Sequence, residues 1–283
     1  MDNGVKVATP RAMVENVLQL ISLPEIYLRL QNTIDDPLHS REQIADVITY
    51  DPALSARVLR IANSSYYSFP REIETVVSAV GIIGELDLRN LVLATTVVGS
   101  MSSLNYKGID IDAFWLHSLR CAISARLIAK SVNGHNPEIL FLAGMLHDLG
   151  ILVIYQQNPI LAGSIARQME EKHQLRDQAE RELLGFDHAE VGALLIEAWG
   201  LSAELAELTR CHHQYQLAQD NKPAGLMLAF ANLLADANTA LIGASDIRLE
   251  AMMGSLGTDQ DRLAEIIESG EKQCQEVKTI ILG

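Results

Sequence analysis

Residues 138–155, EILFLAGMLHDLGILVIY, decide the fold of this chain. The stretch is apolar on almost every side and contains no proline, so its pattern predicts one helix that is buried all round. Its one ionisable pair, His147 and Asp148, lies near the middle. Burying an imidazole and a carboxylate without partners costs several kcal/mol. Something in the fold must therefore satisfy these two side chains.

Two arrangements would satisfy the pair. A divalent metal ion could lie between the two side chains, because imidazole nitrogen and carboxylate oxygen are ordinary metal ligands. Alternatively, His147 and Asp148 could form a hydrogen bond with each other inside a helical core. The dipeptide alone favours the hydrogen-bonded pair, because structural pairs of this kind are common. The metal remains open at this point.

The composition indicates a globular protein built from helices. The chain has 283 residues, of which 48% are hydrophobic, 20% charged and only 5% aromatic. This length fits one large domain or two small ones. The formal net charge of −14 argues against a nucleic-acid backbone or an anionic membrane as the main partner. We therefore expect neither nucleic acid nor membrane as a partner.

The cysteines and the N-terminus indicate the compartment. Cys121, Cys211 and Cys274 are scattered and form no CxxC pair, which fits a reducing compartment and excludes a cysteine-based zinc site. The first residues, MDNGVKVATPR, lack the apolar core of a signal peptide. The apolar stretch is interrupted by His147 and Asp148, so we do not interpret it as membrane-spanning. We predict a cytoplasmic protein.

The rest of the chain has helical periodicity, and no alternating strand pattern persists. Helix starts are marked by residues that cap a helix N-terminus: Ser40 with Gln43, Asp51 before Pro52, Asp187, and Ser202. The polar segment 102–108 divides the chain. We predict an all-α fold in which an N-terminal helical lobe, residues 1–104, packs on a second helical lobe, residues 105–283, whose C-terminal segment 258–282 covers the core.

Polar side chains recur on successive apolar helices of the second lobe. Side chains that project into the core of a helical bundle build metal sites. Histidine and carboxylate ligands suit iron, manganese, zinc or magnesium, as one or two ions, with positions left open for water or phosphate. The candidate ligands are His117, His147, Asp148, His188, His212, His213 and Asp236.

The order of these residues resembles the HD superfamily of metal-dependent phosphohydrolases, whose ligand positions fall on His117, His147, Asp148 and Asp236. The chain also resembles the HDOD family from about Leu23 to Asp236. The blocks that carry this resemblance are LPEIYLRLQ, DPALSARVLRIANSSYYSFPREIETVVSAVGIIG, LRNLVLA, FWLHSLRCA, FLAGMLHDLG, FDHAEVGALLIEAWGL and CHHQY. The resemblance implies that the second lobe is of the HD type.

The family resemblance implies a regulatory role in bacterial signalling, since HDOD proteins resemble HD hydrolases and many have lost ligands. Here His188 and the His212–His213 pair resemble the additional ligands of binuclear HD enzymes that cleave cyclic di-GMP. Two departures count against that activity. The lysine usual after HD-x-G is Ile151, and the GYP motif expected after the paired histidines is replaced by QYQLAQDNKPAG.

Two functions follow. The family favours a non-enzymatic signalling module, whose HD-like pocket binds signalling proteins or a phosphate-containing small molecule. The alternative is a metal-dependent phosphohydrolase that acts on a nucleotide or another phosphate ester. In the enzyme, His147 and Asp148 would be catalytic, and Asp148 would bridge two metals with a metal-bound hydroxide as nucleophile. One metal would be held by His117, His147, Asp148 and Asp236, the other by Asp148, His188, His212 and His213.

Overall fold

The computed structural model describes residues 8–132, 135–236 and 247–282. Over these ranges the chain is helical and contains no strand, which confirms the all-α prediction. The elements are α1 (Pro10–Leu18), α2 (Glu25–Asp35), α3 (Arg41–Thr49), α4 (Pro52–Ala62), α5 (Val76–Ile83), α6 (Glu85–Ser102), α7 (Ile111–Ser131), α8 (Pro137–Leu146), α9 (Leu149–Gln157), α10 (Pro159–Lys172), α11 (Arg176–Leu184), α12 (His188–Ala198), α13 (Ala203–Cys211), a 3₁₀ turn (Tyr215–Leu217), α14 (Lys222–Asp236), α15 (Ile247–Leu256) and α16 (Gln260–Ile281).

The helices begin where capping residues satisfy their first backbone N–H groups. Ser40 and Gln43 form a reciprocal capping box at α3, as predicted. Asp51 caps α4, Asp187 caps α12 and Ser202 caps α13. Each cap removes an orphaned donor at a helix start. Local sequence therefore determines the positions at which these helices begin.

The apolar stretch that organises the chain is two helices, not the single helix predicted from its pattern. Helix α8 ends at Leu146 and α9 begins at Leu149, with Asp148 at φ −98° and ψ 6°, outside helical geometry. Neighbouring side chains in a continuous helix point about 100° apart. Because the helix breaks at His147 and Asp148, both side chains face the same cluster. The predicted continuous helix is therefore wrong.

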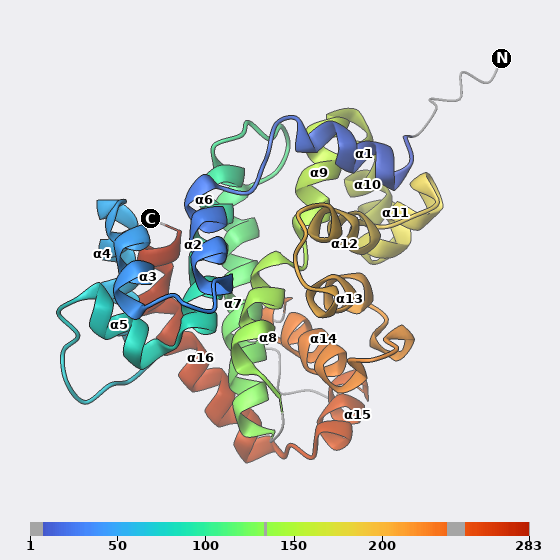
Figure 1. The fold of residues 1–283 in the computed structure, drawn as a ribbon. Coiled ribbons are helices and arrows are strands. Elements are labelled where there is room, and N and C mark those ends of the chain that lie inside the picture. Colours follow the sequence, from blue (N-terminus) through green and yellow to red (C-terminus); the bar gives the residue numbers. More distant parts are fainter. Residues whose placement is uncertain (1–7, 133–134, 237–246, 283) are drawn as a thin grey trace.

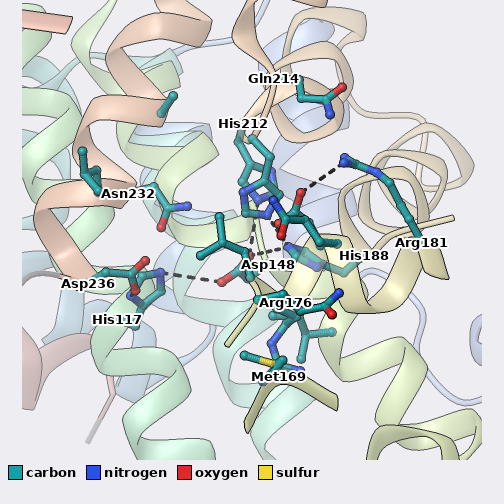
Figure 2. Close-up of a pocket in the computed structure, with 18 of the residues that line it drawn as sticks. His117, Asp148, Met169, Arg176, Arg181, His188, His212, Gln214, Asn232 and Asp236 are labelled. Atoms are coloured by element: carbon teal, nitrogen blue, oxygen red, sulfur yellow. Dashed lines mark hydrogen bonds and ion pairs between the residues drawn. The ribbon is translucent and has the colours of Figure 1, made fainter. Parts of the chain in front are cut away.

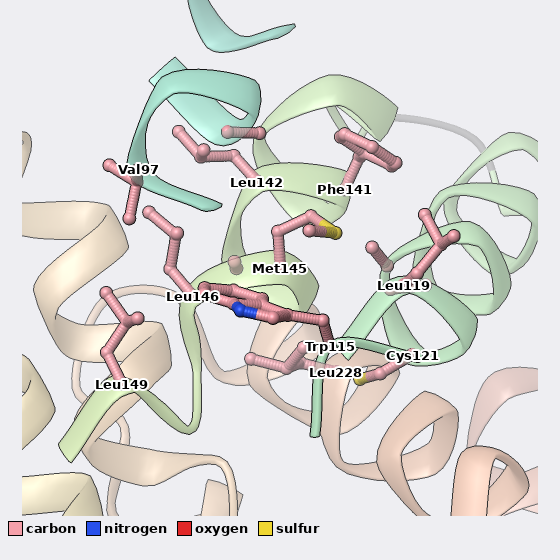
Figure 3. Close-up of a cluster of buried hydrophobic side chains, with 14 of the residues drawn as sticks. Val97, Trp115, Leu119, Cys121, Phe141, Leu142, Met145, Leu146, Leu149 and Leu228 are labelled. Atoms are coloured by element: carbon pink, nitrogen blue, oxygen red, sulfur yellow. The ribbon is translucent and has the colours of Figure 1, made fainter. Parts of the chain in front are cut away.

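Helices α7 and α8 form the centre of the core. Figure 1 shows α7 and α8 running through the middle, with α3–α5 on one side and α9–α15 on the other. Trp115 of α7 lies against Leu146 of α8 and beside Leu228 of α14 (Figure 3). By length and composition Pro137–Gln157 would suffice to cross a membrane, but 94% of an 18-residue window within this segment is buried inside the protein. The stretch is the hydrophobic core of the fold.

The helices pack around two hydrophobic clusters. The smaller one lies within residues 30–92, and the larger one joins the central helices to the helices on either side. The predicted division at residue 104 stays a prediction, and the two ends of the chain contact helices on both sides of it. Helix α1 packs against α9 and α12, where Met13, Val14 and Val17 are buried. At the other end of the chain, α16 packs on both α7 and α4.

Gly150 is required where α9 meets α12. A Cβ atom at this position would lie 1.9 Å from the carbonyl oxygen of His188 and 2.8 Å from the backbone nitrogen of Gly192. We therefore expect Gly150→Ala to push the two helices apart and to lower the free energy of unfolding by about 1–3 kcal/mol or more. Urea denaturation of the metal-free protein measures this change.

Gly163→Ala is the matched control for this prediction. Gly163 also lies inside a helix, α10, but no atom lies within 4 Å of its added Cβ. Alanine has the higher helix propensity, so this variant should be as stable as the wild type or more stable by up to about 1 kcal/mol. Equal stability of the two variants would show that the contact between α9 and α12 tolerates a methyl group.

Candidate metal centre

The predicted ligands come from five places in the second lobe and meet beside one cavity (Figure 2). His117 lies in the middle of α7, and the pair His147–Asp148 forms the break between α8 and α9. His188 is the first residue of α12. The paired histidines His212 and His213 lie directly after the end of α13. Asp236 is the last residue of α14.

Asp148 lies at the centre of the cluster and divides the histidines between its two oxygen atoms. Its Oδ2 lies 3.2 Å from Nε2 of His147 and 3.6 Å from Nε2 of His117. Its Oδ1 lies 3.2 Å from Nε2 of His188 and 3.5 Å from Nε2 of His212. A carboxylate with each oxygen facing a different pair of imidazoles has the arrangement of a ligand that bridges two metal ions.

Two groups of donor atoms result, and they share Asp148. The first group is His117, His147 and Asp148; the second is Asp148, His188, His212 and His213, with the donor atoms of each group within 4.8 Å of one another. His213 joins the second group because its Nε2 lies 2.9 Å from Nε2 of His188.

Asp236 lies outside both groups. Its carboxylate contacts Nδ1 of His117 at 3.3 Å, on the side of the ring that faces away from Asp148. The sequence placed it on an apolar helix, but its side chain is 69% exposed. The contact fits a carboxylate that orients His117, and a role for Asp236 as a direct metal ligand stays a prediction.

The hydrogen bonds of the buried rings determine which nitrogen faces the centre. Nδ1 of His147 donates to the carbonyl oxygen of Gly144 at 2.8 Å, and Nδ1 of His212 donates to that of Thr209 at 2.7 Å. Since a carbonyl only accepts, Nδ1 carries the proton in each ring. In the neutral ring the Nε2 lone pair then points toward Asp148, and lone pairs that converge in this way repel unless a proton or a metal ion lies between them.

A metal ion fits this arrangement. An ion about 2.1 Å from each ligand, at tetrahedral or octahedral angles, places ligand atoms about 3.0–3.4 Å apart. The separations of 3.2–3.6 Å around Asp148 are close to this range. In addition, Oδ1 of Asp148 and Nε2 of His212 are buried without a hydrogen-bond partner. The residues present therefore suit a bound metal.

The electrostatics leave several of these groups in the protonation state that a metal requires. Burial by itself would raise the pKa of Asp148, but His147 and His188 hold it well below its ordinary value. Burial and the neighbouring imidazoles lower the pKa of His212 well below its usual range and that of His213 to about 3. Near neutral pH these groups are a carboxylate and two neutral imidazoles.

Glu180 is a residue of the site that the sequence did not reveal. It lies on α11, is only 1% exposed, and accepts hydrogen bonds from Nδ1 of His188 at 2.6 Å and from its backbone nitrogen at 2.8 Å. Burial opposes the charge on His188, but Glu180 and Asp148 raise its pKa to about 10. A carboxylate behind a metal-bound histidine fixes its orientation and increases its basicity. Glu180 is therefore placed to orient His188.

No local signal distinguishes Glu180 from its neighbours. The segment RDQAERELL is rich in charge and indicates a solvent-exposed helix. Only the packing of α11 against α12 turns Glu180 toward the cluster. Its exposed neighbour Glu182, two residues later, instead pairs with Lys172 at the surface.

We expect Glu180→Gln to weaken metal binding about 10–100-fold, because the buried charge behind His188 is lost while the side-chain shape is kept. The measurement is manganese affinity by competition with a chromogenic chelator. Glu182→Gln is the matched control on the same helix and should leave the affinity unchanged. Equal affinity of the Glu180→Gln variant and the wild type would show that Glu180 does not support the site.

The cluster adjoins a cavity of about 640 Å³. Beside Asp148 and four of the five cluster histidines, its wall includes Arg176, Arg181 and Asn232. Ile151 also lines the cavity, so the departure from the lysine of the cyclic-di-GMP enzymes falls within the site itself. A cavity of this size accommodates a small molecule.

The fold and the site together define an all-α protein with a histidine–aspartate cluster suited to divalent metal. The HDOD domain family matches residues 20–215, about two thirds of the chain, and the chain belongs to this family. The match includes six of the seven predicted ligands and ends before Asp236.

Solved structures of similar proteins agree with this assignment. A candidate phosphohydrolase from Shewanella amazonensis SB2B is 30% identical, with a TM-score of 0.77 over 99% of this chain and 100% of its own. An HDOD domain protein of unknown function from Geobacter sulfurreducens is 26% identical, with a TM-score of 0.74 over 97% and 99%. Among curated proteins, an uncharacterised protein from Treponema pallidum (strain Nichols) is 25% identical over 225 residues, or 78% of this chain. The chain spans 43% of the length of that relative.

Proposed function

We propose that this HDOD protein is a signalling module in which the histidine–aspartate cluster holds divalent metal and the adjoining cavity binds a phosphate-containing small molecule. The observation that carries the proposal is the convergence of four Nε2 atoms on the two oxygens of Asp148 beside that cavity. The concave shape of the site favours a small molecule over a signalling protein as its direct ligand.

The donor set narrows the choice of metal. The second group offers three imidazoles and one carboxylate, a set that suits iron, manganese or zinc better than magnesium, which prefers oxygen ligands. The bound metal supplies positive charge and open coordination positions, to which phosphate oxygens are suited. His147, His188 and His212 hold the donor atoms in place through their Nδ1 hydrogen bonds.

Hydrolysis of a phosphate ester is the second candidate function. It is favoured by the two donor groups that share Asp148, because two-metal sites clamp the attacking and leaving oxygens of a phosphoryl transfer. In this function the residues proposed as catalytic are His147 and Asp148. Ile151 counts against it, because this apolar side chain in the cavity wall contributes no charge to a phosphate.

Metal analysis of protein purified without chelators tests the proposal. We expect one or two equivalents of iron, manganese or zinc. Manganese-loaded protein is then incubated with bis-p-nitrophenyl phosphate and with p-nitrophenyl phosphate, and release of nitrophenol is measured. Binding of phosphate without turnover supports the signalling module, whereas turnover that depends on Asp148 supports the enzyme. Absence of metal even after loading would overturn both functions.

A further inference from the structure

We infer that Arg176 is the residue that binds the phosphoryl group of the ligand, which lies between the guanidinium and the metal cluster. This inference rests on the proposed function, because it requires a metal-loaded site. It identifies the ligand class as a phosphorylated small molecule held at two points. It also assigns a role to a residue that neither the motifs nor the metal cluster explains.

Arg176 reaches the cavity from the first turn of α11. Arg176 lines the same cavity as His117, Asp148 and His188, and Figure 2 labels it near the Asp148–His188 pair. Its Nη1 atom is buried and has no hydrogen-bond partner. A buried donor without a partner costs about 1–3 kcal/mol, and more when it is charged. An anion in the cavity would supply the missing acceptor.

Arg181, five residues later on the same helix, is an arginine with a structural role. Its Nη1 donates to Asp177 at 3.1 Å and its Nη2 donates to Asp187, the N-cap of α12. Both terminal nitrogens are thus engaged by carboxylates, one on α11 itself and one at the start of α12. The chain has 36 acidic and 22 basic residues, so carboxylate partners are abundant. Nη1 of Arg176 nevertheless has no carboxylate partner, as expected for a donor that binds a ligand.

Tyr155 holds Arg176 in place without using its donors. The Arg176 Cζ atom lies 5.9 Å from the centre of the Tyr155 ring, at the limit of a cation–π contact. Such a contact uses none of the guanidinium N–H groups as hydrogen-bond donors. Two parallel N–H groups of a guanidinium match two phosphate oxygens, which is why arginine is favoured at phosphate sites.

The other residues that line the cavity indicate where the remainder of the ligand would lie. Ile151 is apolar, and the buried Asn232 has a side-chain oxygen without a hydrogen-bond partner. An amide presents either a donor or an acceptor after rotation, so Asn232 suits a polar group on the body of the ligand. The phosphoryl group therefore lies by Arg176 and the metal, and the body of the ligand extends toward α14.

The test titrates inorganic phosphate into manganese-loaded protein and follows the heat of binding. Arg176→Gln should weaken phosphate binding about 10–100-fold, because a charged hydrogen bond contributes about 1.5–3 kcal/mol. Arg176→Lys keeps a charge but not the paired N–H groups, so it should fall between the wild type and Arg176→Gln. Manganese content should be the same in all of these proteins.

Arg262→Gln is the control for loss of a positive charge. Arg262 lies on α16, where it pairs with Glu265 at the surface, and it does not line the cavity. Its replacement should leave phosphate affinity within about 2-fold, since an exposed pair contributes little. A melting curve of each variant verifies that it is folded, and Arg176→Lys serves in place of Arg176→Gln if the latter does not fold.

The outcomes separate this inference from the function on which it rests. The wild type could bind manganese while Arg176→Gln binds phosphate as tightly as the wild type does. This result would overturn the role of Arg176 and leave the metal centre intact. Manganese-loaded wild type that does not bind phosphate would also overturn it. Loss of manganese in Arg176→Gln would show a structural role instead. A wild type that binds no metal would refute the proposed function, and the inference with it.

Discussion

Asp148→Asn should abolish metal binding and with it the stabilisation that manganese gives to the folded protein. Asp148 contributes a donor to both ligand groups, and a neutral amide is a far weaker ligand than a carboxylate. At a free manganese concentration about 100 times the dissociation constant, the wild type gains about 2.7 kcal/mol of stability. The variant should gain almost none.

The measurement is a melting series on both proteins with chelator and with excess manganese. With chelator, the variant should already be less stable, because His147 and His188 lower the pKa of Asp148 in the folded state. A carboxyl group whose pKa is lowered by folding stabilises the protein at pH values above its ordinary pKa. This stabilisation is lost as the pH falls through the pKa of the folded state. A wild type that melts at the same temperature with manganese and with chelator would refute the metal centre.

Asp236→Asn tests whether Asp236 is also a metal ligand. The structure places Asp236 outside both ligand groups and largely in solvent, so this variant should keep most of its manganese-dependent stabilisation. Loss of metal equal to that in Asp148→Asn would instead assign Asp236 as a ligand, as its place in the HD pattern suggests. Asp261→Asn, an exposed position at the start of α16, controls for the loss of one negative charge.

Glu138→Gln should lower the free energy of unfolding by about 3–5 kcal/mol, because it leaves a buried guanidinium without its counter-ion. Arg126 is only 2% exposed, and its Nε donates to Oε1 of Glu138 at 2.6 Å. The hydroxyl of Tyr66 donates to the other carboxylate oxygen at 2.9 Å, and Nη1 of Arg126 donates to the Tyr66 carbonyl at 2.9 Å. The network joins the loop after α4 to α7 and α8.

Urea denaturation in the presence of chelator measures this effect without any contribution from metal. Glu265→Gln is the matched control, since Glu265 pairs with Arg262 at the surface and its replacement should cost less than about 1 kcal/mol. Adding Arg126→Met to Glu138→Gln should recover part of the loss by removing the unpaired charge. A cost of Glu138→Gln similar to that of the surface control would show that water or another group satisfies Arg126.

The sequence alone determined the features that depend on neighbouring residues. The capping residues Ser40, Asp51, Asp187 and Ser202 occupy the predicted helix starts, because a cap needs only a side chain two or three positions from an orphaned N–H. The all-α class followed from helical periodicity and composition. The family resemblance, carried by several motifs, indicated the candidate ligands before their positions in space were known.

Tertiary structure decided how those ligands meet. In the sequence, residues 138–155 look like one uninterrupted helix, because nothing local marks the break at His147 and Asp148. The break is required only by burial on all sides and by the convergence of α7, α12 and α13 on Asp148. The same packing turns Glu180 inward while leaving Glu182 in solvent. A charged residue on an amphipathic helix has the same local pattern in either position. Which side it faces depends on a neighbouring helix distant in sequence, and that information exists only in the folded chain.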